Sequence, residues 1–193
     1  MSRFLIIPLI GGLLAVGLQA DEKSQIAQIR KWYAEIEADK SLKKTSYKSG
    51  EEPHTVMLTR HVSVAGELKK LSLQAGGEHG HGSTTYYFHK GQLFFVYDAS
   101  ESWYITGGNE DGTETESIDI GRQYRYYFHD GKCIRALGKT VQTKDGAKLR
   151  ELMKKAENEP ISYHETAPKV LRKAMALSKI KSRAELEKYF RMP

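Results

Sequence analysis

Two histidines one residue apart, His79 and His81, are the sharpest chemical feature of the sequence. Neutral imidazole nitrogens ligate Zn²⁺ and Cu²⁺, so the pair suggests a transition-metal site. His89 and His129 hold equivalent positions in two similar segments, and both could approach the pair if those segments are neighbours. A structural zinc usually takes four protein ligands, and residues 76–82 contain four glycines. The alternative is therefore an incidental pair on a mobile, glycine-rich loop.

Cys133 is the only cysteine, and it could act as a nucleophile if a base lay beside it. His129 is close in sequence, but strand alternation predicts that it points to the opposite face. Because Cys133 occupies the position that Leu93 holds in the other similar segment, we interpret it as a small core residue. The chain has no HExxH motif, phosphate-binding glycine loop or CxxC pair. We predict no catalytic residue, and we keep an enzyme without a local motif as the least favoured alternative.

Positive charge is concentrated in the C-terminal quarter. Residues 139–193 hold 14 Lys and Arg against 7 Asp and Glu, whereas residues 21–138 hold 15 against 17. Such a basic segment could bind phospholipid headgroups or anionic glycans. The alternatives are a solvated helical face or a contact with the acidic segment 98–119. The candidate residues for an anionic surface are Lys169, Arg172, Lys173, Lys179, Lys181 and Arg183.

The eleven tyrosines are concentrated in segments with strand character. They could form an exposed platform for a glycan or a peptide, although strands favour aromatic residues for packing alone. The aromatic and basic segments lie in different parts of the chain, so we expect no nucleic acid as a partner.

The first twenty residues have the pattern of a secretory signal peptide. One positive charge at Arg3 precedes an apolar run over residues 4–18, and charged sequence follows Ala20. The run is shorter than the roughly 20 residues that cross a bilayer. We therefore predict export to the periplasm or secretion, with cleavage near Ala20.

A segment of eight residues occurs twice in similar form, and the other predicted elements are arranged around its two copies. Residues 86–93 read Tyr-Tyr-Phe-His-Lys-Gly-Gln-Leu, and residues 126–133 read Tyr-Tyr-Phe-His-Asp-Gly-Lys-Cys. Each copy has an aromatic strand, a two-residue Xaa-Gly turn and a second strand, which predicts a β-hairpin. The predicted pairs are Phe88 with Leu93, Tyr87 with Phe94, Phe128 with Cys133 and Tyr127 with Ile134.

The remaining elements follow from the hydrophobic period. Helical spacing predicts an amphipathic helix over residues 24–39, and residues 40–53 are predicted to be a loop. Period-two segments start at residues 56 and 68, and residues 103–105 are expected to form a short strand. Three short helices are expected after residue 143, with Thr166 as the cap of the second and a capping box starting at Ser182 for the third.

This order predicts an α+β fold with an antiparallel sheet of about five to seven strands. We divide the chain into a signal peptide (1–20), a sheet domain (21–142) and a basic helical subdomain (143–193).

The Tyr-Tyr-Phe-Xaa-Xaa-Gly hairpins, the N-terminal helix and the leader together resemble small exported bacterial proteins of unassigned function. The resemblance covers residues 24–137 and implies the sheet, with no catalytic residue or ligand. We expect a non-enzymatic envelope protein that binds a partner: another envelope protein, a glycan or an anionic membrane surface. The alternative is a zinc or copper protein that uses His79 and His81.

Overall fold

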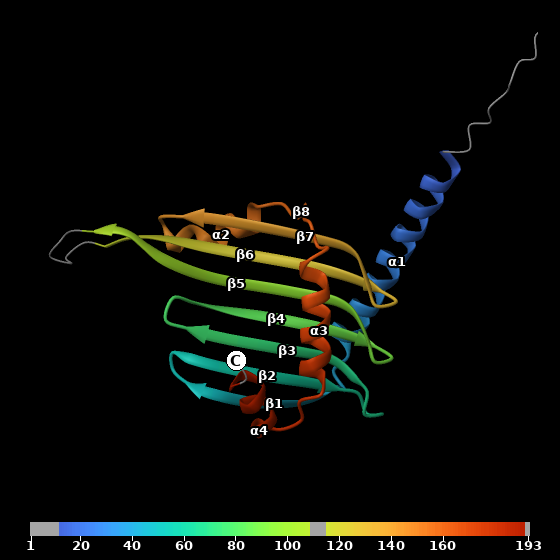
Figure 1. Cartoon of the computed structure of the whole chain (residues 1–193), viewed down its shortest axis with the longest axis horizontal. Coiled ribbons are helices and arrows are strands. Elements are labelled where there is room, and N and C mark those ends of the chain that lie inside the picture. The colour runs from blue at the N-terminus through green and yellow to red at the C-terminus, as the bar shows by residue number, and fades with distance from the viewer. Residues whose placement is uncertain (1–11, 109–114, 192–193) are drawn as a thin grey trace, which may run out of the picture.

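The chain forms one eight-stranded antiparallel sheet with helices on both faces (Figure 1). In this computed structural model, residues 12–108 and 115–191 are described. The strands lie in chain order, each beside the next, with the bounds β1 Lys43–Glu51, β2 His54–Val62, β3 Leu68–Gly77, β4 Gly80–His89, β5 Gln92–Gly108, β6 Thr115–His129, β7 Lys132–Thr143 and β8 Glu159–Pro160. The helices are α1 Gly12–Ala38, α2 Gly146–Lys155, α3 Thr166–Ser178 and α4 Arg183–Arg191.

The predicted α+β class and antiparallel sheet are confirmed, but the predicted number of five to seven strands is wrong. The first missed strand is β1, which lies in the segment predicted to be a loop. It is an edge strand made almost entirely of exposed polar residues, and its Tyr47 packs partly against the core. The second is β8, which has two residues. Neither strand carries the apolar alternation that marks a half-buried strand in sequence.

The glycine-rich segment 76–82 is paired strand rather than the predicted mobile loop. Gly77 pairs with Gly80, so Glu78 and His79 form the turn between β3 and β4. At Gly80 the φ angle is +153°, and a Cβ atom there would lie 2.3 Å from the carbonyl oxygen of Glu101. Glycine is needed here because β5 approaches this backbone too closely for a side chain.

The two copies of the repeat form the β4–β5 and β6–β7 hairpins. Both central turn residues have positive φ in each hairpin, at 50° and 76° for Lys90-Gly91 and at 47° and 73° for Asp130-Gly131. That is the type I′ geometry of a two-residue hairpin. The pairs Phe88–Leu93 and Phe128–Cys133 are confirmed by the strand register.

The next predicted pair in each hairpin is wrong, because each second strand contains a β-bulge. Tyr87 pairs with Phe95 rather than Phe94, and Tyr127 pairs with Arg135 rather than Ile134. The extra residue turns Phe94 and Phe95 to the same face of the sheet, where both pack in the core under α1.

Two cores lie on opposite faces of the sheet. The smaller one joins α1 to the sheet through Ile26, Ile29 and Ile36. The larger one joins α3 and α4 to the other face, where α3 crosses the strands and α4 lies at the β1 end of the sheet (Figure 1). The C-terminal helices thus share a core with the sheet, through Ala174, Leu177 and Leu186.

The helix α2 lies on the same face as α1. A Cβ atom on Gly121 would touch Met153 and Leu149 of α2. Along β6 the side chains alternate, so Gly121 shares its face with Tyr127, which packs under α1.

Among the described residues, no helix is long and apolar enough to cross a membrane. The predicted signal peptide stays a prediction, since residues 1–11 lie outside the described part and residues 12–20 form the start of α1.

Candidate functional site

A groove crosses the sheet on the face that carries α1 and α2. It has a volume of about 800 Å³ and takes side chains from β1 to β7 and from α2. We name this groove the polar trough, because hydroxyl, amide and charged side chains dominate its lining.

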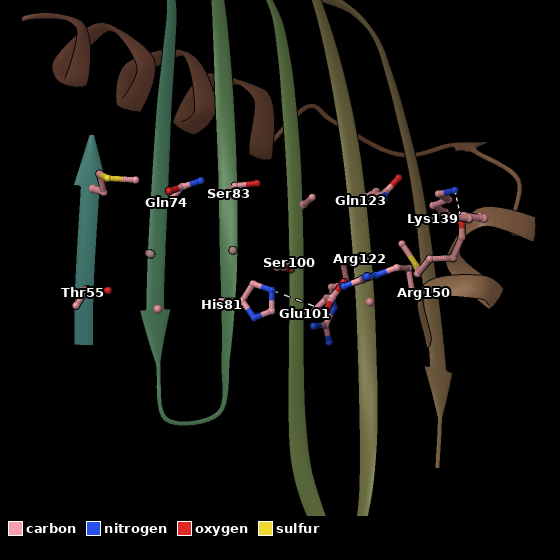
Figure 2. Close-up of a pocket in the computed structure, with 18 of the residues that line it drawn as sticks. Thr55, Gln74, His81, Ser83, Ser100, Glu101, Arg122, Gln123, Lys139 and Arg150 are labelled. Carbon is pink, nitrogen blue, oxygen red and sulfur yellow. Dashed lines mark hydrogen bonds and ion pairs between the residues drawn. The ribbon is translucent and has the colours of Figure 1, made fainter. Parts of the chain in front are cut away.

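The strand register produces the first row of the trough. Paired residues of an antiparallel sheet point to the same face, and here the pairs continue across four strands from Gln74 to Ser83, Ala99 and Gln123. Figure 2 shows Gln74, Ser83, Gln123 and Lys139 in a line across the strands. This row places donors and acceptors side by side at strand spacing, about 4.8 Å apart.

A second row lies two residues further along the same strands. It consists of Gly76, His81, Glu101 and Gly121, which pair in that order. Two of these four positions are glycine, so little side-chain volume fills the floor. The His81 Nε2 atom lies 3.8 Å from a carboxylate oxygen of Glu101 (Figure 2), and the two side chains are 72% and 45% exposed.

Hydroxyl side chains extend the polar surface on the other side of the first row. Ser46 and Thr59 lie 2.9 Å apart, and Ser72 and Thr85 lie 3.5 Å apart, in each case between hydroxyl oxygens. These four residues come from β1 to β4 and follow the same face of the sheet. The face between α1 and α2 therefore carries three adjacent polar rows, of which the first two line the trough.

Cations dominate the rim at the α2 side. Arg150 and Lys154 are exposed on α2 and line the trough. Lys139 has a structural role, because its ammonium donates to the carbonyl oxygens of Met153 and Ala156 at the end of α2. Lys48, at the β1 end, lies 3.6 Å from a Glu52 carboxylate. The α2 rim thus presents positive charge to a ligand in the trough.

The four candidate metal ligands fall into two separate places. His79 packs edge-on against Trp103, with ring centroids 4.7 Å apart, and His81 lies in the trough. His89 lies at the other end of β4, roughly 26 Å away for eight residues of strand. It lines a small pocket of about 280 Å³ together with His129 and Trp32.

The structure thus places His89 and His129 around one pocket, away from His79 and His81. Among residues 12–108 and 115–191, no three His, Cys, Asp or Glu side chains are grouped to hold a metal ion. The zinc or copper site stays a prediction. Unchanged zinc and copper binding after substitution of both His79 and His81 by Gln would contradict it.

Cys133 is half-buried against the larger core. Burial raises the pKa of its thiol to about 11, which keeps the sulfur protonated at neutral pH. The thiol donates to the carbonyl oxygen of Arg135, 3.3 Å away. This environment suits a packed thiol rather than a nucleophile.

The basic residues proposed for an anionic surface lie on the face opposite the trough, and all six are exposed. Lys169, Arg172 and Lys173 share the outer side of α3, since they are spaced at three and four residues. Arg183 differs from them, because its Nε atom lies 2.7 Å from Glu187.

Sequence reasoning missed the trough residues other than His81. Their types, Ser, Thr, Gln and Gly, are the ordinary polar half of alternating strands, and a single sequence does not distinguish them from any solvated face. The signal that the sequence did contain is a succession of strands that each have a polar face. Four of these strands, β1 to β4, are consecutive.

These features define the class: an α+β protein with a continuous meander sheet, helices on both faces and an open polar trough. No protein-family model, no curated protein and no solved structure matches the chain.

Proposed function

We propose that this chain is an exported binding protein whose ligand lies in the polar trough. The observation that carries the proposal is a groove of about 800 Å³ on this sheet face, lined by two adjacent rows, one with Gln74, Ser83 and Gln123 and the other with His81 and Glu101. A groove of this volume suits a small ligand or a short part of a polymer. Export is supported by the leader pattern in the first twenty residues.

The side chains of the trough favour a hydroxyl-rich ligand such as a glycan. Hydroxyl and amide groups can each donate and accept, as sugar hydroxyls do. Gln74 and Gln123 flank the first row, with Ser83 between them. The cations Arg150 and Lys154 on the rim favour an acidic glycan over a neutral one.

The test is titration calorimetry of the full-length chain with acidic and neutral oligosaccharides of equal length. We expect the acidic set to bind more tightly, with a difference that shrinks as salt concentration rises. Substitution of Gln74 and Gln123 together by Leu should weaken binding about tenfold or more, since each loses hydrogen bonds in the bound state.

A matched control is Gln92→Leu, which changes an exposed glutamine at the β4–β5 turn, outside the trough. Equal affinity of the control and the Gln74/Gln123 variant for every sugar that binds would contradict the trough as the binding site. If none of the acidic or neutral oligosaccharides binds, the proposal of a glycan ligand is contradicted.

A second candidate function is binding to an anionic membrane surface through α3 and α4. It is favoured by the exposure of all six basic residues and of Met175 and Phe190, which are 40% and 41% exposed. A basic face with apolar side chains is typical of helices that lie on a membrane.

Charge substitution tests this candidate without damaging the core. Lys169, Arg172 and Lys173 are changed to Gln, with the exposed Lys43, Lys44 and Lys132 changed to Gln as a control of equal net charge. Each basic residue near an anionic surface contributes about 1 kcal/mol. We expect the α3 variant alone to lose sedimentation with phosphatidylglycerol vesicles, and equal loss in both variants would contradict the assignment to α3.

A further inference from the structure

A second cleft lies on the same face as the trough, between α1 and the strands β5 and β6. It has a volume of about 500 Å³, within the roughly 300–1,000 Å³ range of small-molecule sites. We name it the aromatic cleft. Its apolar lining consists of Ile29, Tyr33, Phe95, Tyr97 and Tyr127.

Packed rings form the floor of the aromatic cleft. Phe95 and Tyr127 are both 8% exposed, and their ring centroids are 5.1 Å apart. Tyr33 of α1 meets Phe95 edge-on at 5.5 Å and is itself 39% exposed, so it forms a wall that a ligand can reach. Because the floor rings are fixed by packing, the apolar part of the site is formed before any ligand arrives.

Two arginines line the cleft from opposite elements, Arg125 from β6 and Arg30 from α1. The Arg125 guanidinium lies over the Tyr97 ring, 5.1 Å from its centroid, and donates to the side-chain oxygen of Asn158. Both partners, the Tyr97 ring and the Asn158 amide, are uncharged, so they orient the guanidinium without neutralising its charge.

Arg30 is exposed on the outer part of α1. Within the described part of the chain, no guanidinium nitrogen of Arg30 or Arg125 lies within 4 Å of a carboxylate oxygen. An apolar floor beside two guanidinium groups without a close carboxylate is complementary to a ligand with an apolar body and a negative head.

We propose that the aromatic cleft binds a small amphiphilic anion, with its apolar body on the rings and its carboxylate or phosphate head at Arg30 and Arg125. Guanidinium groups form paired, charge-assisted hydrogen bonds with both kinds of head. The site is separate from the polar trough but adjoins it, since Tyr97 and Arg125 lie two residues from Ala99 and Gln123 along β5 and β6.

The test is titration calorimetry of the full-length chain with laurate, dodecyl phosphate and dodecanol, the two anions below their micelle-forming concentrations and dodecanol below its solubility limit. We expect laurate or dodecyl phosphate to bind at one molecule per chain and dodecanol to bind at least tenfold more weakly, because it lacks the charged head. Tighter binding of either anion supports the proposal and identifies the head group.

Variants then assign the site. Arg30→Gln combined with Arg125→Gln should weaken anion binding about ten- to hundredfold, and Arg125→Lys should weaken it less, because the positive charge is kept. The matched control is Arg172→Gln, an exposed arginine on the opposite face, which should bind as the parent does. Tyr33→Ala should weaken laurate and dodecanol alike, since it removes the reachable wall.

Equal affinity of dodecanol and laurate for the unaltered chain would overturn the proposal, whatever the variants do. It would also be overturned if the double arginine variant, folded by circular dichroism, bound the anions as tightly as Arg172→Gln. A Tyr33→Ala variant with unchanged laurate affinity would do the same.

Discussion

At the scale of single residues, Arg60 is a buried cation that joins β2 to the end of α3. It is 9% exposed, and its Nη1 atom donates to the carbonyl oxygens of Ser178 and Ile180 at 2.7 and 2.8 Å. These carbonyls end α3, where the chain has no further helical N–H groups to supply. A cation from β2 therefore fixes the end of α3 to the sheet, and it also suits the negative end of the helix dipole.

We predict that Arg60→Met lowers the free energy of unfolding by about 2–4 kcal/mol, because two buried carbonyl groups lose their donor. Arg60→Lys should cost less, since an ammonium can still donate to one of them. Urea denaturation measures both. Equal losses in the two variants would show that packing of the side chain, and not its hydrogen bonds, stabilises this contact.

His89 gives the protein a predictable response to acid. Its ring stacks on Trp32 at 4.2 Å with a 9° angle between the planes. Burial, together with the positive charges of Lys69 and Lys90, lowers its pKa below the ordinary 6.5. The native state therefore favours neutral His89, and its contribution to stability is present above pH 6.5 and is lost as the pH falls through the lower, folded pKa.

We accordingly predict that urea denaturation at pH 7.5 and pH 5 shows a larger stability difference for the parent than for His89→Gln. His164→Gln, at an exposed histidine, should keep the parent difference. His61, whose pKa is also lowered by burial, acts in the same direction, so the comparison between variants is more informative than the slope itself. An unchanged slope in His89→Gln would contradict the prediction.

At the scale of elements, α2 packs closely on the sheet because Gly121 of β6 has no side chain. A Cβ atom on Gly121 would lie 2.8 Å from both Cγ and Sδ of Met153 and 3.4 Å from Leu149. We predict that Gly121→Val lowers the free energy of unfolding by about 1–3 kcal/mol, because two branched methyl groups push α2 outward. Hydrogen exchange in α2 should rise with it.

Two further variants isolate this cause. Gly107→Val is the matched control, because nothing lies within 4 Å of a Cβ atom there, and we expect a change within about 0.5 kcal/mol. Met153→Ala in the Gly121→Val background should restore part of the protection of α2, since it makes room for the valine. A loss of protection spread over the whole sheet would instead indicate damage to β6 itself.

The elements that sequence reasoning recovered are those whose signals are local. The Lys90-Gly91 and Asp130-Gly131 turns specified both hairpins. The predicted capping box at α4 is confirmed in part: the Glu185 amide donates to the Ser182 hydroxyl at 3.2 Å, but the Glu185 carboxylate accepts from the amide of Lys181 rather than from that of Ser182. Thr166, predicted to cap α3, is instead its first helical residue. The bulges at Phe94 and Ile134 were missed because an inserted residue leaves no mark in a period-two pattern that is apolar on both faces.

The candidate site was harder to predict than the fold for a related physical reason. Gln74, Ser83 and Gln123 are distant in sequence and become a row through pairing across four strands. The two sites that we propose depend on such cross-strand neighbours, and the aromatic cleft also needs α1. Residues that act together only through long-range pairing carry no short motif.

At the scale of the whole molecule, the two faces of the sheet differ in how far helices cover them. The face under α3 and α4 holds the larger core, while the face between α1 and α2 is left open as the trough and the aromatic cleft. The basic residues of α3 lie outside the larger core, so any membrane contact through them would leave the trough facing away. The two proposed functions are therefore sterically compatible.

The shared core predicts how the molecule responds to truncation. Leu177, Ile180 and Leu186 of the C-terminal segment are at most 5% exposed. Each large apolar side chain stabilises by about 1.5–3 kcal/mol on burial, so these three contribute roughly 5–9 kcal/mol. That is comparable to the whole stability of an ordinary domain, about 5–15 kcal/mol.

We therefore predict that a chain ending at residue 161, without α3 and α4, shows no cooperative unfolding transition in urea and binds the dye anilinonaphthalene sulfonate, because Leu58, Leu71 and Tyr86 become exposed. A chain ending at residue 180, which loses α4 alone, should still unfold cooperatively at a lower urea concentration, since α4 contributes Leu186 to a core that α3 still covers. A cooperative transition with the parent midpoint in the shorter chain would show that the sheet and α1 fold on their own, and that the C-terminal helices are an appended subdomain.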